Sequence, residues 1–247
     1  MRNKQRSILF VFFAAASVAL CTASRADDLP VSSGTDQSDD PFENVNRASY
    51  DLSMFLDRNA LRPVAEAYVD VVPEPARNGA RNFLDNLNSP VIFVNNLLQG
   101  DGDAAGNTMT RFLINSTIGI GGLMNPAADL GYPADDEDFG ITLGRWGVDA
   151  GPYLFVPVLG PSSPRDAVGY ATDFAVEPLT YWRGSVWVPV GLTAVDIVDT
   201  RARNIESTDQ IERTSIDGYA AVRSLYRQFR EAKINKGESG VQKLPEY

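Results

Sequence analysis

The feature that most limits how this chain can fold is a set of three uncharged stretches, each interrupted by turn-forming residues. They cover Asn86–Gly100, Leu113–Ala128 and Ala150–Pro164. A helix that spans a bilayer needs roughly 20 predominantly apolar residues, and each stretch is too short and contains Gly, Pro or Asn. Two interpretations are open. The stretches form a buried core, or they lie in one leaflet of a membrane or line an apolar channel without crossing the bilayer.

Helical spacing of apolar residues dominates the rest of the chain after residue 40. The first predicted helix is amphipathic, with Asp40 as its N-cap and Pro41 at its first position, and it continues to Leu56. Further helices are predicted over residues 63–71, 74–87, 91–98, 103–115, 165–175, 190–205 and 208–234. The last of these carries one broad apolar stripe, which consists of Ile211, Ile216, Tyr219, Val222, Leu225, Tyr226 and Phe229.

The middle of the chain, residues 117–164, is rich in Gly, Pro and aromatic residues. Its best strand candidate is Leu154–Val158, although Pro157 suits it poorly for a central strand. So much irregular chain is uncommon in a helical domain, so this segment either has a function or contains short helices that the pattern does not reveal. The predicted fold class is mainly α, a single domain over residues 41–234 with a Gly/Pro-rich middle segment.

The first residues predict export. Arg2, Lys4 and Arg6 precede an apolar run from Ile8 to Leu20, which together are typical of a cleavable signal segment over residues 1–26. Two processing alternatives are open. Cleavage after Ala26 would release a chain beginning at Asp27, or Cys21 would be lipidated and become the first residue. A lipoprotein signal has a small residue before its cysteine, and Leu20 occupies that place here.

Flanking segments on both sides of the predicted domain are polar. Residues 27–40 read as a flexible tether and residues 235–247 as a polar tail. The net charge is −10 for the whole chain, and removing the four positive charges of residues 1–26 leaves −14. Such a balance argues against nucleic acid as a partner, since phosphate binding depends on Lys and Arg. Any membrane contact must therefore be apolar, or be made through a lipid anchor or a protein partner.

Catalytic and metal chemistry have little support in the composition. The chain has no histidine, which excludes Ser-His-Asp and Cys-His catalysis and His-ligated zinc, and its single cysteine excludes an internal disulfide. The Asp101–Asn107 segment resembles the start of a calcium loop but lacks the ligands at Ala105 and Phe112, so a helix boundary is favoured, with Gly100 ending one helix and Asp103 capping the next. A solvated acidic turn is likewise favoured over a divalent-cation site for Asp135–Asp138. No catalytic residues, cofactor or metal site are predicted.

Ordered short phrases from Asp40 to Tyr226 carry a resemblance to a known family. They include Asp-Pro-Phe-Glu at residue 40, Phe-Gly-Ile-Thr-Leu-Gly at residue 139 and Gly-Pro-Tyr at residue 151. In this order they resemble the MlaA (VacJ) family of Gram-negative outer-membrane lipoproteins. The residues that carry the resemblance are Asp40, Pro41, Asn46, Arg47, Gly100, Arg111, Phe112, Phe139, Gly140, Gly144, Gly151, Pro152, Tyr153, Arg165 and Asp166.

This resemblance implies a ring-like helical protein in the inner leaflet of the outer membrane, facing the periplasm. It implies phospholipid transport that maintains outer-membrane lipid asymmetry, by a channel that removes mislocalised phospholipid from the outer leaflet. The implied partners are phospholipid, a trimeric porin and a soluble periplasmic carrier, with no enzymatic activity and no cofactor. With the resemblance, the uncharged stretches favour membrane and channel over a plain core.

Two alternative functions remain open, and one segment is singled out. The first alternative is an envelope structural or interaction protein that binds a porin without moving lipid, and the second is a carboxylate-dependent periplasmic hydrolase. The helix that contains Asn46, Tyr50, Asp51, Leu52 and Phe55 has a mixed polar and apolar face. We interpret these five residues as a channel-controlling segment, the alternative being an ordinary amphipathic surface helix.

Overall fold

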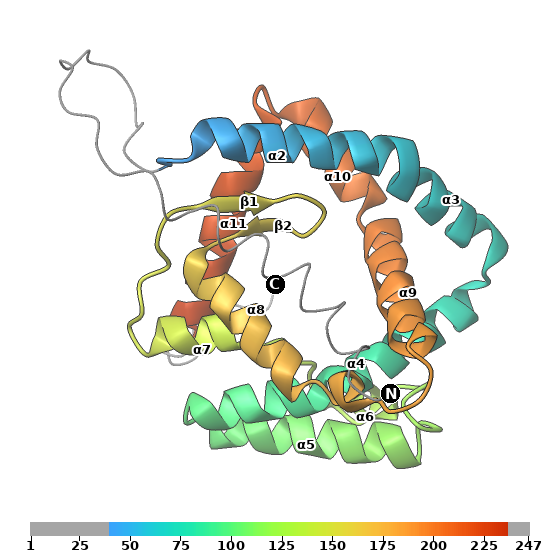
Figure 1. Ribbon diagram of the computed structural model, residues 1–247. Coiled ribbons are helices and arrows are strands. Elements are labelled where there is room, and N and C mark those ends of the chain that lie inside the picture. The colour runs from blue at the N-terminus through green and yellow to red at the C-terminus, as the bar shows by residue number, and fades with distance from the viewer. Residues whose placement is uncertain (1–39, 237–247) are drawn as a thin grey trace, which may run out of the picture. The chain divides into compact units, whose positions relative to one another are not determined.

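A computed structural model describes residues 40–236, which form a mainly helical unit with one small hairpin (Figure 1). The mainly α fold class is therefore confirmed. The predicted signal segment, Cys21, residues 27–39 of the tether and the tail beyond residue 236 lie outside the described residues. The first elements are α2 (Glu43–Leu56), the π-helix η2 (Asp57–Leu61), α3 (Arg62–Val71), α4 (Glu74–Leu98) and α5 (Gly102–Thr117). After them come α6 (Pro126–Asp129), α7 (Phe139–Arg145), β1 (Leu154–Val156), β2 (Gly160–Ser162), α8 (Pro164–Val176), the 3₁₀-helix η3 (Pro178–Tyr181), α9 (Trp187–Arg203), α10 (Ile205–Thr214) and α11 (Gly218–Asn235).

Within residues 40–236 the helices follow one another around a ring (Figure 1). α9 contacts α3 and α4, α4 packs along α5, and α7 contacts both α8 and α11. The hairpin joins the ends of the circuit, because β1 contacts α2 and β2 contacts α11. Buried side chains are accordingly spread over several contacts, and among the described residues more of them are polar than apolar.

The start of α2 differs from the prediction. Phe42 is the N-cap residue and the helix begins at Glu43, so Asp40 and Pro41 precede it. The Asp40 carboxylate still accepts a hydrogen bond from the Phe42 N–H at 3.2 Å, but its side chain is buried against other elements. The prediction was wrong because the cap pattern does not reveal partners far along the chain.

Two helices predicted over residues 74–87 and 91–98 are one helix, α4. Pro90 lies inside it and removes one backbone hydrogen bond. α5 packs along α4, and Val91, Ile92 and Asn95 are buried beyond the proline. Tertiary burial therefore outweighs the local cost of the proline.

The middle of the chain contains the short helices α6 and α7 that the pattern did not reveal. Its predicted strand is confirmed only as β1, three residues long, which pairs antiparallel with β2 in the register Phe155 to Pro161. Val158 lies in the turn with φ +71°, and Gly160 follows it with φ +88°. Helix α5 is capped by Asp101 rather than by the predicted Asp103, because the Asp101 side chain accepts from Ala104 N at 2.9 Å.

The predicted final helix is two helices, α10 and α11, and its single apolar stripe is wrong. Ile216 lies in the connection between them and is fully exposed, and Leu225 and Phe229 are also exposed. Tyr219 is buried instead, beside the start of α11 at Gly218. A Cβ at Gly218 would lie 2.6 Å from the Tyr50 hydroxyl, so glycine lets α11 begin in close contact with α2.

Candidate functional site

The predicted channel-controlling segment lies on α2, but its residues do not share one face. Asn46 is buried and Tyr50 is partly buried, whereas Asp51, Leu52 and Phe55 are exposed. The first two contact the hairpin and α11, and the last three are open to solvent. α2 is therefore anchored at one face and open at the other.

Asn46 is the residue that fixes α2 to the hairpin. Its Nδ2 donates to the Tyr153 carbonyl at 2.9 Å, and its Oδ1 accepts from the Phe155 N–H at 2.9 Å. Nδ2 also donates to the Asp40 carboxylate at 2.9 Å. A buried amide with both groups satisfied specifies one register between α2 and β1.

Asp40 extends this anchor to α11. Its carboxylate accepts hydrogen bonds from the Tyr219 hydroxyl and from Arg223, the latter at 3.3 Å. Burial, helped by the bond to Asp40, raises the pKa of Tyr219, so the phenol stays protonated as a donor. Arg47 adds a bidentate ion pair to Asp217, with N–O distances of 3.1 and 2.7 Å. Its guanidinium also lies 4.6 Å from the centre of the Tyr219 ring.

An aromatic cluster packs beneath these bonds. Tyr50 contacts Phe155 and Tyr219 edge to face, with ring centres 5.4 and 5.9 Å apart. Tyr153 contacts Tyr219 and Tyr226 in the same way, at 6.0 and 5.9 Å. Such pairs add about 0.5–1.5 kcal/mol each beyond the area they bury. α2, β1 and α11 therefore meet in one compact contact.

A second polar cluster joins α7, α8 and α11. Arg230 donates to the Asp138 carboxylate at 2.5 and 3.0 Å and to Asp166 at 2.6 Å, and Asp166 also accepts from the Tyr226 hydroxyl and from Arg165 at 3.0 Å. Burial alone would raise the pKa of Asp166, but the bonds from Tyr226 and Arg230 outweigh it and lower that pKa. Asp166 therefore stays ionised.

Three glycines allow this cluster to close. A Cβ at Gly140 would lie 2.5 Å from Arg230 Nη2, and one at Gly144 would lie 2.5 Å from the Ile234 side chain. At Gly169 the clash would be with backbone, 2.3 Å from Gly140 N. α7 and α8 thus approach at a distance that only glycine permits.

Remaining motif residues also serve the fold. Gly100 and Gly151 have φ of +76° and +73°, where a side chain would strain the backbone. Arg111 donates to the Tyr132 carbonyl at 2.5 Å and to Asn125 at 3.3 Å, and burial lowers its pKa. Pro41 is exposed, and Phe112, Phe139 and Pro152 are half-buried.

The residues that join both clusters were not predicted as site residues: Asp138, Tyr219, Arg223, Tyr226 and Arg230. Four of them recur on α11 at helical spacing and lie on one face, a pattern that mixes aromatic and basic residues. Sequence reasoning assigned Tyr219 and Tyr226 to an apolar stripe and left the arginines aside. An alternation of Tyr and Arg on one helix face is the signal that could have found them.

The acidic segment Asp135–Asp138 is not the solvated turn that was favoured. Glu137 is buried and pairs with Arg145 at 3.0 Å, and Asp138 pairs with Arg230. Asp135 and Asp136 pair with Lys236 and Lys233. Over residues 40–236, no group of three or more carboxylate, Cys or His side chains could hold a metal ion.

α4 and α9 meet at an ion pair with two further carboxylates beside it. Arg81 donates to Asp199 at 3.0 and 3.2 Å. Asp85 lies one turn after Arg81, and Asp196 lies one turn before Asp199. Both side chains are exposed in part, and partial desolvation raises the pKa of each, although the positive charge of Arg203 opposes the rise.

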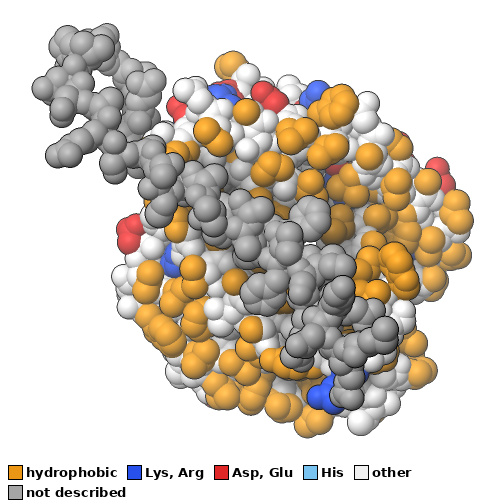
Figure 2. All heavy atoms as spheres, viewed as in Figure 1, with side chains coloured by type: hydrophobic (Ala, Val, Ile, Leu, Met, Phe, Trp, Pro, Cys, Tyr) orange, Lys and Arg blue, Asp and Glu red, His pale blue; other side chains and the backbone are white. Residues whose placement is uncertain are grey.

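The surface of this unit is unusually apolar. Figure 2 shows one face on which hydrophobic side chains are widespread and charged ones lie near the edge. Exposed apolar residues come from α2, the α5–α6 loop and the hairpin turn, and include Val45, Phe55, Ile118, Ile120, Leu123, Met124, Val158 and Leu159. Among the described helices, none combines the length and apolar character that crossing a bilayer requires.

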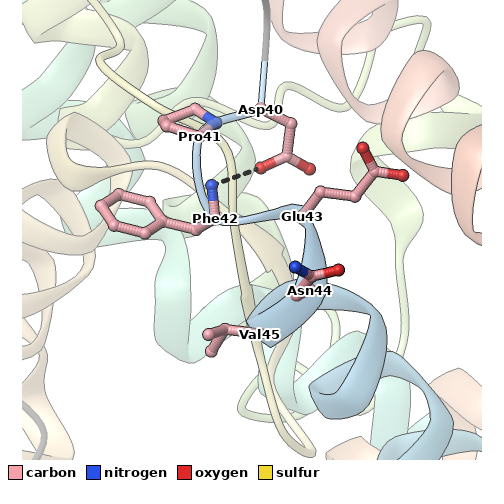
Figure 3. Close-up of a pocket in the computed structure, with 6 residues that line it drawn as sticks. All are labelled: Asp40, Pro41, Phe42, Glu43, Asn44 and Val45. Carbon is pink, nitrogen blue, oxygen red and sulfur yellow. Dashed lines mark hydrogen bonds between the residues drawn. The ribbon is translucent and has the colours of Figure 1, made fainter. Parts of the chain in front are cut away.

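A pocket at the start of α2 is shown in Figure 3. It is open to solvent and lined by six consecutive residues, 40–45. Within it the Phe42 N–H donates to the Asp40 carboxylate, and the Glu43 N–H donates to the Asp40 carbonyl, both at 3.2 Å. Because a single segment lines it, it does not bring residues of several elements together around a ligand.

Comparison with known proteins gives a consistent result. The family model for the MlaA lipoprotein matches residues 38–233. The intermembrane phospholipid transport system lipoprotein MlaA of Shigella flexneri is 39% identical over 222 residues, which cover 87% of this chain and 86% of that protein. Its counterpart of the same name from Haemophilus influenzae is 33% identical over 95% of this chain and 93% of its own length.

A solved structure is similar as well. It comes from a study of the structural basis for maintenance of bacterial outer membrane lipid asymmetry. It superimposes with a TM-score of 0.72 at 36% sequence identity, covering 79% of this chain and 99% of that one. An uncharacterized protein of Rickettsia conorii is 34% identical over 81% of this chain and 80% of its own length.

Proposed function

Because this chain belongs to the MlaA lipoprotein family, we propose that it works in intermembrane phospholipid transport, which maintains the lipid asymmetry of the outer membrane. The observation that carries this function is the match along nearly the whole described unit, in sequence and in three dimensions. Phospholipid is the substrate and the cell envelope is the place of action.

We propose further that the ring lies in the inner leaflet of the outer membrane, facing the periplasm. There it forms a channel that removes mislocalised phospholipid from the outer leaflet and passes it to a soluble periplasmic carrier, next to a trimeric porin. Two properties support this location: many large apolar side chains are exposed, and no described helix is suited to cross a bilayer. A monotopic protein has both properties.

The chain acts without catalysis in this proposal. It has no histidine, and the carboxylates of Asp40, Asp138 and Asp166 accept hydrogen bonds from arginine or tyrosine side chains of the fold. A carboxylate-dependent hydrolase would need an acid and a base free to reach a substrate. These three carboxylates are instead engaged in joining helices.

α2 is proposed to control the channel. It is held at both ends, by Asn46 to the hairpin and, through the following π-helix, by Asp57 to Arg201 at 2.6 and 2.8 Å. Between these anchors the exposed side chains of Leu52 and Phe55 make no part of the buried contacts. Between the ends, one face of α2 is also held, because Tyr50 packs on Phe155 and Ser53 Oγ accepts from the Val158 N–H at 3.1 Å. The opposite face, with Leu52 and Phe55, can be presented to lipid. π-Helical segments are frequent at functional sites.

The test is complementation in a Gram-negative host that lacks its own MlaA. The phospholipid of the outer leaflet is measured before and after this chain is expressed. Restoration of a phospholipid-poor outer leaflet supports transport. An unchanged outer leaflet, with the protein folded and porin-bound, supports the alternative of an envelope interaction protein that does not move lipid. Mass measurement of the mature N-terminus separates lipidation at Cys21 from cleavage before Asp27.

A further inference from the structure

The connection between α8 and α9 exposes an aromatic cluster that nothing in the described unit covers. Tyr181 is 68% exposed, Trp182 52% and Trp187 76%. Val186, Val188 and Val190 beside them are exposed too. We call Tyr181, Trp182 and Trp187 the aromatic corner. It lies at the lower end of α9 in Figure 1, where α8 and η3 lead into that helix.

This corner is held in shape by its own hydrogen bonds. The Trp182 indole donates to the Ser185 carbonyl at 3.2 Å, and the Tyr181 hydroxyl donates to the Ala175 carbonyl at 2.5 Å. A Cβ at Gly184 would lie 2.7 Å from Trp182 Nε1, so glycine lets the indole fold back over the turn. The Tyr181 and Trp182 rings are thus positioned, and their exposure is a property of the fold rather than of loose side chains.

The segment that carries the aromatic corner has a single charged residue. Between Glu177 and Asp196 the only charged residue is Arg183, which lies between Trp182 and Gly184. The chain as a whole is acidic, so one isolated arginine among aromatic and β-branched residues is a local reversal of sign. A guanidinium recognises phosphate by paired hydrogen bonds.

We propose that the aromatic corner is the protein's anchor in the phospholipid headgroup layer, with Arg183 directed to lipid phosphate. Trp and Tyr concentrate at this depth because their rings are apolar and their N–H or O–H groups are polar. Phospholipid is favoured over a protein partner because the exposed aromatic segment, residues 178–195, carries one charge and that charge is positive. This inference rests on the proposed membrane location, and it does not depend on lipid movement.

The non-helical backbone of the aromatic corner limits how deeply the corner can insert into the bilayer. Residues 182–186 are not helical, and an irregular backbone exposed to hydrocarbon would leave its polar groups without partners. In the headgroup layer, water and phosphate supply those partners. The corner therefore stays at headgroup level, while the apolar surface of neighbouring elements can extend deeper.

Depth-dependent fluorescence quenching tests this placement, because the chain has only three tryptophans. Trp146→Phe with Trp182→Phe leaves Trp187 as the reporter. The full chain is reconstituted in vesicles of zwitterionic and anionic phospholipid that carry a nitroxide on the headgroup or near the acyl-chain end. We expect the headgroup label to quench Trp187 about twofold more strongly than the deep label, since indoles favour the interface. Equal quenching by both labels, or stronger quenching by the deep label, would overturn the proposal.

Arg183→Gln tests the phosphate contact, with Arg213→Gln on α10 as a matched exposed control. We expect the first substitution to reduce headgroup quenching of Trp187 and the second to leave it unchanged. Equal effects of the two would show that Arg183 has no special contact with phosphate. Co-flotation with vesicles is measured in parallel. Protein that floats without quenching of Trp187 refutes the corner but leaves the membrane location standing, and protein that does not float refutes both.

Discussion

Asn46 and Phe155 are joined by a hydrogen bond in which the Phe155 N–H donates to the Asn46 side chain, 109 positions earlier in the chain, at 2.9 Å. The same amide donates back to Tyr153, on the other side of Leu154. The Asn46 side chain therefore hydrogen-bonds to the backbone at β1 in the way that a neighbouring strand would. Through this contact a two-stranded hairpin, too small to be stable alone, becomes part of a helical ring.

Asn46→Ala should therefore destabilise the fold strongly. It removes three hydrogen bonds and leaves Phe155 N and Tyr153 O buried without partners, each costing about 1–3 kcal/mol. The free energy of unfolding should fall by about 2–4 kcal/mol. Thermal unfolding followed by circular dichroism measures this. Asn44→Ala, an exposed asparagine on the same helix, is the control and should change little.

Gly169→Ala should destabilise the contact between α7 and α8. The added methyl would meet the backbone of Gly140 at 2.3–2.6 Å, and helix backbones cannot move aside as a flexible side chain can. We expect a loss of about 1–3 kcal/mol or more, as for other overpacked sites. Gly106→Ala in α5 is the opposite case, because nothing lies within 4 Å of its Cβ and alanine favours helix by about 0.5–1 kcal/mol. Chemical denaturation that ranked the two variants equally would contradict this explanation.

The fold class was predictable from sequence because apolar periodicity marks helices wherever one face is buried. α3 was predicted to within one residue and α8 closely, since Pro63 and Pro164 mark their starts. Pro90 misled the prediction for the same reason: it is a local signal, and the packing of α5 on α4 outweighs it. Local patterns thus locate helices better than they locate breaks within them.

The site was harder to predict because its bonds connect distant positions. Asp166 meets Tyr226 and Arg230, and Asp40 meets Tyr219, at separations that no local spacing encodes. The family resemblance pointed to Asp40 and Asp166 but not to their partners. Those partners lie on α11, where an aromatic and basic face was interpreted as an apolar stripe.

Asp85→Asn should stabilise the fold at neutral pH and not at low pH. The raised pKa of Asp85 means that the folded state disfavours its charged form, mainly through desolvation, with Arg203 opposing the rise and Asp196 adding to it. That cost is present at pH 7 and disappears as the pH falls through the raised pKa and then below the ordinary value of about 3.9. The unfolding temperature of the variant should exceed that of the intact chain at pH 7 and approach it at acidic pH. Asp70→Asn, at an exposed position of α3, is the control for a general loss of negative charge. A gain of the same size at both pH values would rule out Asp85 ionisation as the cause.

Deleting Asp51 and Leu52 should test whether α2 is a controlling element, because the shortened helix cannot keep the contacts at both of its ends. Removing two residues rotates the remainder of the helix by about 200° and shortens it by about 3 Å. Asn46 can then keep its bonds to β1, or Asp57 can keep its ion pair with Arg201, but the chain cannot keep both in the present arrangement. We expect the phospholipid content of the outer leaflet to differ from that given by the intact chain in the same MlaA-deficient host. The single substitution Ala48→Ser, at an exposed position of the same helix outside the controlling segment, leaves both anchors in register and serves as the control, with lipid distribution unchanged. If the deletion variant, present at a normal level in the membrane, gave the same lipid distribution as the intact chain, α2 would be an ordinary surface helix.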